Sequence, residues 1–544
     1  MCGIVGVIGS YDHIRFERMV DILSHRGPDA RNIFRDENCI LGHTRLKVID
    51  TSDYANQPMV SACGNYIIVF NGEIYNYKDI RRSLDVKLYT NSDTEVLLYA
   101  YIKWDESCLG RLNGMFSFAI WDRKKQKLFA ARDRFGIKPF YYYHDLERFI
   151  FASEIKAILK AGIARVPNYH TIYDFVRWGA IDHSERTWFK NVYSLPQGCC
   201  LSMKNGFIRI RRYWSLTDIV DEKENPAEEG IIEEFTYLLE DSIKLQMVAD
   251  RRVGINLSGG VDSSVLTVLA SRLRDDITTY TFGYDEHQYD ERPFAKEVAG
   301  IVGVENYTSL LTAEDVERYF LRVLIEEDEP FTSFRQLSHN KLYSDYKTTG
   351  STVVLEGSGG DEIGAGYIGF LWSWYLDLIN EKGPEIGMMQ FSQEADLLGM
   401  NLDDKLAFAL GSAANYSQYG ICTSDGIPFV NPDVLHERFV RDYATDFPNY
   451  EKPFKSNLRN AQFIEMFYTK LPRGLRYVER ASSSAGREAR VPLLDPRIVA
   501  IGFKAPNKSK ILNGQFRKFM KESIRNILPN EITRVNKRTV ADPQ

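Results

Sequence analysis

The sequence is poor in cysteine and lacks the patterns that usually give cysteine a structural role. Its 544 residues include seven cysteines, widely scattered, with no Cys-x-x-Cys pair and no Cys/His spacing suited to zinc. A disulfide framework and a zinc knuckle are therefore excluded. We expect most of these thiols to be inert, buried side chains.

The sequence also lacks long hydrophobic runs and an excess of charge of one sign. No segment reaches the roughly 20 apolar residues needed to span a bilayer, and the opening stretch has no basic region. The formal net charge is -6, with Lys and Arg spread among Asp and Glu. These features predict a cytoplasmic protein with no membrane partner and no nucleic-acid partner.

The length of the chain and the change in its hydrophobic pattern predict two domains of different architecture. Up to about residue 160, short apolar runs such as 67–70 and 115–122 predict strands, with a helix at 92–104. Residues 194–201 are predicted to form a loop, and a polar run follows near 218–230. Beyond it, long helical patterns alternate with single buried strands, which predicts a parallel sheet with helices on both faces.

Cys2 stands where removal of Met1 would place a thiol and a free α-amine on one residue. An α-amine titrates near ~8 and can accept the thiol proton, directly or through one water. Position alone is weak support for such a nucleophile. The segments MCGIVGVIG, SHRGPDA, LGHTRLKVID, FNGEIYNY, NSDTEVLL and ARDRFGIKPFYY follow in order, however, and together they resemble the class II glutamine amidotransferase domain.

The side chains in these segments suit glutamine hydrolysis. The Asn71 amide and the Gly72 backbone N–H can donate to a tetrahedral oxyanion, although Asn-Gly alone would equally predict a hairpin turn. Arg45 offers a bidentate fork for the α-carboxylate of glutamine, and Asp93, with Glu73 nearby, can bind its α-ammonium. The predicted catalytic residues are thus Cys2, Asn71 and Gly72.

A second constellation, VGINLSGGVDSSVLTVLA at 253–270, reads as strand, Ser/Gly loop and helix, an arrangement that binds phosphate. It is not a Walker A motif, because no Lys follows the glycines. Ordinary helix capping by Asp or Ser is the alternative explanation. The loop resembles the pyrophosphatase-type loop of synthetases that adenylate a carboxylate, and with EGSGGDEIGAGY, YDERPFAKEVA and VERASSSAGREARVPLLD it makes the chain resemble the glutamine-hydrolysing asparagine synthetase family.

This resemblance implies the fold, the boundaries and the ligands. It implies an N-terminal αββα sandwich of the N-terminal nucleophile type at 2–200, a linker at 201–230 and an adenine-nucleotide-hydrolase-like parallel α/β domain at 231–544, with a homodimer possible. ATP and Mg²⁺ are implied, with Asp262 and Asp361 as metal-binding acids. The implied ATP-binding residues are Leu257, Ser258, Gly259, Gly260, Asp262, Ser263, Ser264, Phe282, Gly357, Ser358, Arg517 and Lys518.

Departures from the family pattern gather in the half that selects the acceptor. Ser358 stands where an acid is usual, with Glu356 two residues earlier as a possible substitute; Ser482–Ser484 replace a Ser-Met-Ala run, and Arg517 replaces a Lys. Aspartate is the favoured acceptor. A sugar uronic acid or another carboxylate is the alternative, and a glutaminase or sensor module with an inactive synthetase half is an alternative of another class. An amidotransferase for a phosphosugar would need no adenylating loop.

Overall fold

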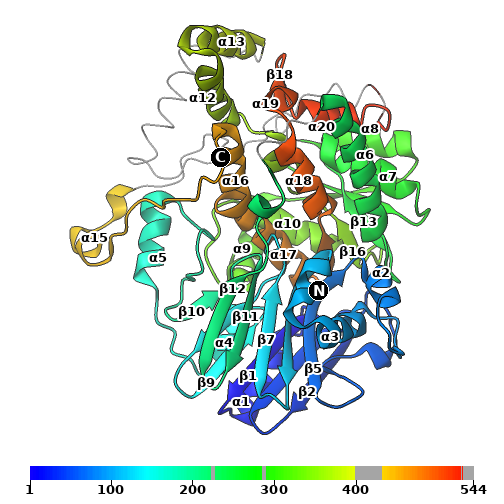
Figure 1. Ribbon diagram of the computed structural model, residues 1–544, viewed down its shortest axis with the longest axis vertical. Helices are drawn as coiled ribbons and strands as arrows, with labels where there is room; N and C mark the ends of the chain where they lie inside the picture. The colour runs from blue at the N-terminus through cyan, green and yellow to red at the C-terminus, as the bar shows by residue number, and fades with distance from the viewer. Residues whose placement is uncertain (222–226, 285–289, 398–431, 529, 531–544) are drawn as a thin grey trace.

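The computed structural model describes residues 1–221, 227–284, 290–397, 432–528 and 530. Residues 1–221 are called the N-terminal half below, and the described residues from 227 onward the C-terminal half. The two halves lie one above the other in Figure 1, with the N-terminal half below.

The N-terminal half is built on two six-stranded antiparallel sheets, ordered β10-β8-β9-β1-β3-β2 and β12-β11-β7-β6-β5-β4. Apolar side chains from their facing surfaces, including Trp121 and Phe151, form the core between the sheets. The strands are β1 (Gly3–Gly9), β2 (Ala30–Arg35), β3 (Cys39–Arg45), β4 (Met59–Val60), β5 (Tyr66–Ile74), β6 (Gly114–Asp122), β7 (Lys127–Arg132), β8 (Tyr141–His144), β9 (Arg148–Ala152), β10 (Val192–Ser194), β11 (Cys199–Lys204) and β12 (Phe207–Arg212).

Helices cover the outer faces of both sheets. Side chains of α1 and α4 pack on the sheet that contains β1, and side chains of α2 and α3 pack on the other. The predicted αββα sandwich is therefore confirmed. The helices are α1 (His13–Asp21), α2 (Tyr77–Arg82), α3 (Asp93–Trp104), α4 (Ile155–Lys160) and α5 (Tyr169–Tyr173), with short helical segments η1 (Asp53–Ala55), η2 (Asp105–Arg111), η3 (Asp174–Trp178) and η4 (Leu216–Asp218).

The C-terminal half contains a five-stranded parallel sheet ordered β15-β14-β13-β16-β17, as predicted. The order reverses at β13, so the crevice beyond the carboxyl ends of β13 and β16 is the expected ligand site of such a sheet. The strands are β13 (Val253–Asn256), β14 (Thr278–Gly283), β15 (Glu305–Leu310), β16 (Val353–Leu355) and β17 (Glu488–Arg490), with a small hairpin of β18 (Ile511–Leu512) and β19 (Gln515–Phe516).

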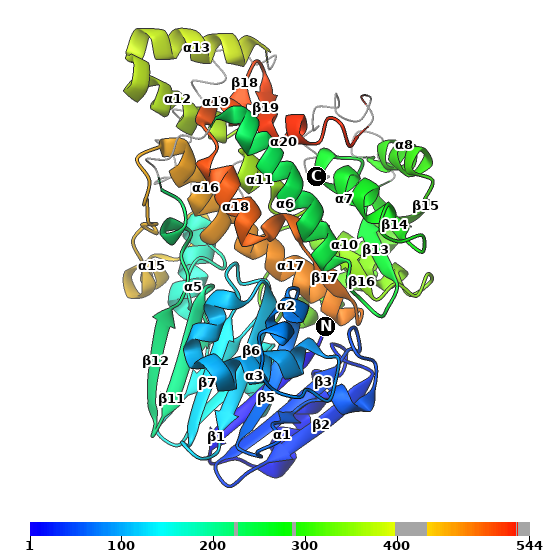
Figure 2. The same cartoon turned by 45° about the vertical axis from the view of Figure 1, so that its right-hand side comes forward.

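Helices surround this sheet, and α12 and α13 project away from it at the top of Figure 2. The helical segments are α6 (Glu228–Gln246), α7 (Val261–Ser271), α8 (Arg292–Val302), α9 (Ala313–Glu327), α10 (Arg335–Asp345), α11 (Gly360–Gly364), α12 (Phe370–Lys382), α13 (Pro384–Leu397), η6 (Pro432–Val434), α15 (Glu437–Tyr443), α16 (Asn457–Phe467), α17 (Lys470–Ser484), η7 (Pro492–Leu494), α18 (Pro496–Lys504), α19 (Asn507–Lys510) and α20 (Lys518–Ser523). Over the residues that the structure describes, no helix combines the length and apolar character needed to cross a membrane.

The two-sheet sandwich of the N-terminal half continues beyond the predicted domain boundary at residue 200. Strand β11 pairs with β7 on one side and with β12 on the other, so residues 199–212 belong to the sandwich, and α6 already begins at Glu228. The predicted loop at 194–201 and linker at 201–230 are corrected accordingly. Leu201 is fully buried in the core between the two sheets, and this burial stabilises residues 199–204 as a strand.

Candidate active sites in the two halves

Cys2 immediately precedes β1 and lies beside the end of β3. Gly3 pairs with Thr44 in the β1–β3 ladder, which brings Cys2 next to Arg45. The Cys2 thiol approaches the carbonyl oxygen of Leu46 at 3.8 Å. The Arg26 guanidinium donates to the backbone oxygen of Cys2 at 3.0 Å. The cysteine is therefore held from both its side chain and its backbone.

Met1 occupies a buried position at the seam between the halves. Its α-amine donates to the carbonyl oxygen of Arg487 at 3.2 Å, and its side chain is 1% exposed. Burial lowers the pKa of this amine to about 5 and raises the pKa of the Cys2 thiol. With Met1 attached, the thiolate form of Cys2 is disfavoured.

Asn71 and Gly72 lie inside β5, where they pair with Ser117 and Phe116 of β6. The hairpin-turn alternative is thus wrong. Gly72 has a φ of +150°, and a Cβ at this position would lie 2.1 Å from the carbonyl oxygen of Met115. Glycine is required there because no larger residue fits between the strands.

The Asn71 side chain is buried, yet neither its oxygen nor its nitrogen has a hydrogen-bond partner among the described residues. Such orphaned groups are rare in protein interiors and point to a missing ligand or water. His43 on β3 contacts the carbonyl oxygen of Phe70 at 3.1 Å, which holds β5 against the strand that ends at Arg45. The Asn71 amide therefore lies on a strand held against β3, whose end at Arg45 adjoins Cys2.

Arg45 is fixed by its own loop rather than by a carboxylate. Its guanidinium donates to the carbonyl oxygens of Ser52 at 2.7 Å and Ile49 at 3.3 Å, to that of Asp50, and to the Asn56 side chain at 2.9 Å. All of these hydrogen-bond partners are neutral, and among the described residues Arg45 forms no ion pair with a carboxylate. Such a group suits the α-carboxylate of an amino acid.

Asp93 and Glu73 form a buried acidic pair. Asp93 begins α3 and accepts a hydrogen bond from the backbone N–H of Ile74 at 3.0 Å. Burial raises the pKa of Asp93 to about 6. Burial also raises the pKa of Glu73, and the neighbouring Asp93 carboxyl adds to the increase. A bound ammonium group would offset the repulsion between the two carboxylates.

Glu73 also forms an ion pair with Arg490 of β17 at 3.2 Å. The sequence prediction placed Glu73 at the glutamine site but did not include Arg490 among the site residues. Arg490 is fully buried and bonds to Glu488 at 2.9 Å and to the carbonyl oxygen of Gln246 at 2.6 Å. This contact ties the N-terminal site to the parallel sheet.

The second site lies where β13 leads into α7. The Ser258 backbone N–H donates to the Ser263 hydroxyl at 3.1 Å, and Gly259 has a φ of +74°. A Cβ on Gly259 would lie 2.5 Å from the Cβ of Phe294. The N-cap of α7 is Gly260, without a side-chain cap, so the capping alternative does not describe this helix end. The backbone N–H groups at such a helix end suit a phosphate.

The other predicted loop residues line the same region. Ser264 is buried, and its hydroxyl has no hydrogen-bond partner within the described part of the chain. Leu257 is buried, and its N–H donates to Tyr280 at 2.8 Å. A Cβ on Gly357 would lie 3.2 Å from the Cβ of Asp262, which brings the β16 loop against the β13 loop. Ser358 follows directly.

Asp262 and Asp361 share one cation. The same guanidinium nitrogen of Arg517 lies 2.6 Å from an Asp262 oxygen and 3.3 Å from an Asp361 oxygen. Among the described residues, no group of three or more His, Cys, Asp and Glu is arranged to hold a metal ion. Mg²⁺, however, usually takes only one or two protein carboxylates together with waters and phosphates. Two convergent carboxylates fit that requirement.

Two predicted ATP-binding residues lie differently from the loop residues. Lys518 points to α6 and pairs with Glu228 at 2.6 Å and Glu522 at 3.0 Å, so its cation is already neutralised. Phe282 on β14 packs near His339, with Arg335 over its ring at 5.9 Å. The structure thus places Arg517, but not Lys518, against the acids.

Lys521 is a residue that the sequence prediction missed. Burial lowers its pKa to about 8, the nearby Arg517 lowers it further in the same direction, and Asp262 opposes the change. Lys521 therefore lies in the electrostatic field of the acid pair. The sequence contained one indication of this residue. Lys521 follows Arg517 by four residues at the start of α20, and residues with that spacing share a helix face.

Glu356 directly follows β16, at the edge of the sheet where the strand order predicts the crevice. Its carboxylate accepts from the Asn256 amide at 2.8 Å and the Tyr343 hydroxyl at 3.2 Å. Burial raises the pKa of Glu356. A half-buried carboxylate therefore stands at the carboxyl ends of β13 and β16, two residues from Ser358.

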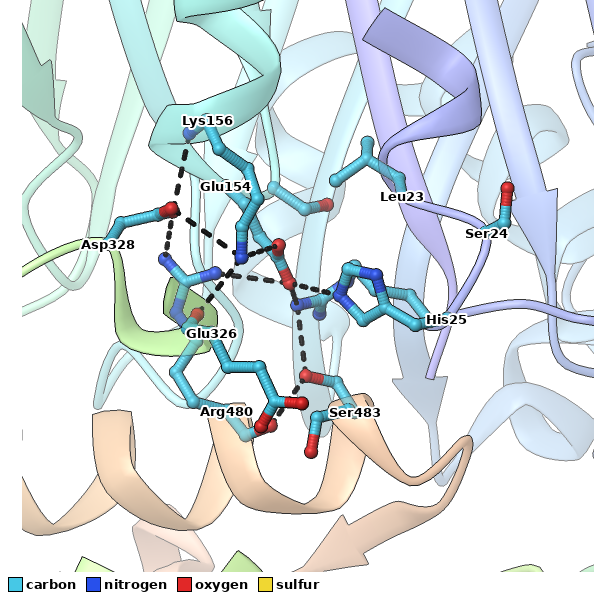
Figure 3. Close-up of polar contacts among 12 residues, drawn as sticks. Leu23, Ser24, His25, Glu154, Lys156, Glu326, Asp328, Arg480 and Ser483 are labelled. Carbon is cyan, nitrogen blue, oxygen red and sulfur yellow. Dashed lines mark hydrogen bonds and ion pairs between the residues drawn. The ribbon is translucent and has the colours of Figure 1, made fainter. Parts of the chain in front are cut away.

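A buried ion network crosses the seam between the two halves, and Figure 3 shows part of it. Glu154 lies 2.7 Å from Arg26 and 3.1 Å from Arg480 of α17, and Arg480 also lies 3.4 Å from Asp328. Arg26, which holds the Cys2 backbone, donates to the Ser483 hydroxyl at 3.2 Å and pairs with Glu479. The Arg26 guanidinium thus connects Cys2 to the helix that carries Ser482–Ser484.

These two sites define a class of protein with an amidotransferase half and an ATP-using half. The glutamine amidotransferase domain model matches residues 1–214, and the asparagine synthase model matches residues 234–544. The second match covers more than half of the chain. The protein belongs to the asparagine synthase family and is a ligase that carries a glutamine amidotransferase domain.

Similar curated proteins support this membership. Asparagine synthetase (glutamine-hydrolyzing) 3 of Bacillus subtilis is 29% identical over 98% of this chain and 85% of its own length. A putative asparagine synthetase (glutamine-hydrolyzing) 2 of Methanocaldococcus jannaschii is 34% identical over 70% of this chain and 78% of its own length. A protein named amidase chyE, of Penicillium rubens, is 29% identical over 83% of this chain and 68% of its own length. The predicted family is confirmed.

Proposed function

We propose that the protein hydrolyses glutamine at Cys2 and uses the ammonia to amidate an ATP-activated carboxylate, with aspartate as the favoured acceptor. The observation that carries the proposal is the buried Asn71 amide beside Gly72, which has no hydrogen-bond partner in the described part of the chain, in a half that also presents Arg45 and Asp93. This arrangement has the donors, the cation and the acid that glutamine hydrolysis requires.

In the first half-reaction the Cys2 thiolate attacks the side-chain carbonyl carbon of glutamine. Asn71 and the Gly72 N–H stabilise the resulting oxyanion, and the α-amine freed by removal of Met1 carries the proton to the departing ammonia. Water then attacks the thioester and releases glutamate. Arg45 and the pair Asp93 and Glu73 hold the α-carboxylate and the α-ammonium of the substrate.

In the second half-reaction the acceptor carboxylate attacks the α-phosphorus of ATP and displaces pyrophosphate. The loop from Leu257 to Ser264, with Gly357, Ser358 and Arg517, is proposed to hold the phosphates. Asp262 and Asp361 would hold Mg²⁺, which would neutralise the charge on the pyrophosphate oxygens. Ammonia then attacks the acyl adenylate, AMP leaves, and Glu356 accepts the excess proton in place of the acid missing at Ser358.

A different acceptor is the second candidate, and Ser358 is the observation that favours it. A hydroxyl at this position changes the acid-base chemistry next to the acyl group, so a sugar uronic acid or another carboxylate is compatible with the site. The intact acids Asp262 and Asp361, which converge on Arg517, argue against a sensor module without ATP chemistry.

A screen of carboxylates by pyrophosphate release tests the proposal. With glutamine and ATP present, we expect AMP and pyrophosphate to accumulate with aspartate and not without a carboxylate. Release with a uronic acid but not with aspartate would transfer the proposal to that acceptor. ADP as the nucleotide product, or no ATP turnover with any carboxylate, would contradict the synthetase assignment.

A further inference from the structure

A cavity of about 290 Å³ lies at the seam between the two halves, apart from both proposed active sites. Its described lining includes neither Cys2 nor the loop between β13 and α7. Strand ends and loops of the N-terminal half meet α16 and α17 of the C-terminal half around it. Its volume is that of a site for a small organic molecule.

One side of the cavity carries guanidinium groups without acidic partners. Arg134 donates to the carbonyl oxygen of Leu112 at 2.7 Å, while its Nε is buried without a hydrogen bond, and Arg132 donates to the carbonyl oxygen of Gly136 at 2.8 Å. In the described ranges of the chain, neither arginine forms an ion pair. The hydroxyl of Thr171, which also lines the cavity, is buried and unbonded there too. These groups favour an anionic ligand group.

Another part of the lining has acids in excess. Arg476 is shared between Asp182 at 2.9 Å and Glu327 at 2.8 Å. Glu329, also in the lining, accepts a hydrogen bond from the neutral backbone N–H of Trp188 at 2.9 Å. Burial raises the pKa of Glu329 to about 7, and a bound cation would lower it again. This part favours a cationic ligand group.

Aromatic rings supply an apolar wall. The ring of Phe135 lies 5.4 Å from that of Trp214 and 6.1 Å from that of Phe467, and all three residues line the cavity. Such rings bury apolar groups well. The cavity thus combines an arginine that forms no ion pair within the described ranges, an acid that accepts a neutral N–H and shares Arg476 and Arg480 with other acids, and an apolar surface.

We propose that this cavity binds a free α-amino acid with an apolar side chain. The carboxylate of the ligand faces Arg134, its ammonium faces Glu329, and its side chain packs on the aromatic wall. The site is separate from the proposed glutamine and acceptor sites, whose substrates have polar side chains. Because both halves line it, the bound amino acid would contact both halves at once.

Isothermal titration calorimetry of the full chain with L-phenylalanine tests the proposal. We expect saturable binding that is at least tenfold weaker for 3-phenylpropionate, which lacks the ammonium, and for 2-phenylethylamine, which lacks the carboxylate. Absence of saturable binding, or equal affinity for all three compounds, would overturn the proposal.

Variants locate the site. Arg134→Gln and Glu329→Gln should each weaken L-phenylalanine binding at least tenfold, whereas Arg209→Gln, which changes an exposed arginine on β12, should leave it unchanged. Because Arg134 also supports buried carbonyls, the near-isosteric Thr171→Val provides a milder change, with an expected loss of about threefold. Unchanged affinity in Thr171→Val and Glu329→Gln would refute the site. Loss of binding in Asp93→Asn would show that the ligand occupies the glutamine site instead.

Discussion

Asn71 is a residue whose buried side chain requires a partner from outside the described chain, a ligand or a water. A buried amide without partners costs free energy, about 1–3 kcal/mol for each unsatisfied group, so a folded chain keeps it where function requires it. Gly72 beside it cannot carry a side chain because the Met115 carbonyl occupies that space. Together, Asn71 and Gly72 supply two hydrogen-bond donors in the middle of β5.

Replacing Cys2 with Ala should separate the two half-reactions. We expect glutamine-dependent synthesis to fall to background, because the nucleophile is lost, while synthesis from added ammonium salts stays within about twofold of the wild type. Product formation with each nitrogen source provides the measurement. Cys63→Ala, at an exposed thiol, serves as the control. Glutamine use that survives in Cys2→Ala would reveal another nucleophile.

The acidity of Asp93 should appear in the pH dependence of glutamine binding. Burial raises the pKa of this carboxyl to about 6, so it is ionised above that pH and protonated below it. Because the α-ammonium requires the ionised form, KM for glutamine should rise as pH falls through about 6, by up to tenfold per pH unit. Asp93→Asn should have a high KM without this dependence. A wild-type KM that stays constant between pH 7 and pH 5 would contradict the assignment.

Glu356 should matter for amide formation and not for glutamine hydrolysis. Because it is the proposed proton acceptor, Glu356→Gln should lower the rate of synthesis by about 10²-fold or more, with glutaminase activity retained. Rates of amide product and of glutamate formation are compared in one assay. Glu297→Gln, which changes an exposed carboxylate on α8, is the matched control and should have a small effect. Full synthesis in Glu356→Gln would mean that another group takes the proton.

At the scale of elements, the loop after β13 and the start of α11 act together. The start of α7, which this loop leads into, supplies Asp262 and α11 supplies Asp361 to the same Arg517 nitrogen. Gly360 and Gly366 allow this approach, since a Cβ on either would lie within 2.8 Å of a carboxyl atom of Asp262 or Asp361. Neither element alone forms the cluster. Its geometry depends on β13 and β16 being neighbours in the sheet.

Asp262→Asn should abolish synthesis with either nitrogen source, because one of two proposed Mg²⁺ ligands would lose its charge. We expect at least a 10²-fold loss of pyrophosphate release and a higher Mg²⁺ concentration for half-maximal activity. Glutaminase activity in the same preparation reports on folding. Normal pyrophosphate release would exclude a metal-binding role for this residue.

At the scale of the whole molecule, the halves are joined by buried charge as well as by apolar packing. Arg480 is 1% exposed and lies between Glu154 of one half and Asp328 of the other. Removing one member of such a network leaves buried carboxylates with fewer partners. The seam is therefore sensitive to single changes.

Arg480→Met should lower the free energy of unfolding by about 3 kcal/mol, since breaking a buried pair typically costs 3–5 kcal/mol and Arg26 and Lys156 remain near Glu154. Urea unfolding followed by fluorescence measures the change. Arg31→Met breaks a surface pair with Glu17 and should cost less than about 1 kcal/mol. Equal effects in both variants would show that the buried network contributes no special stability.

Local patterns predicted much of the fold because apolar periodicity reflects local burial. The helix predicted at 92–104 is α3, and VGINLS gives β13 followed by the phosphate-type loop. The prediction failed at 194–212, where burial of Leu201 depends on the opposite sheet. Asn71-Gly72 is ambiguous in the sequence for the same reason, because pairing with β6 decides between a turn and a strand.

The sequence by itself determined the two-part architecture, the family and most of the residues placed at the two sites, because these follow from ordered motifs and from the chemistry of the side chains they carry. Only the tertiary structure decided that Arg517 rather than Lys518 faces the acids, that Arg490 meets Glu73, and that Arg26 connects Cys2 to α17. These contacts join residues that are far apart in the chain. Which residues meet depends on which strands become neighbours and which surfaces are buried at the seam, and no local sequence pattern contains that information.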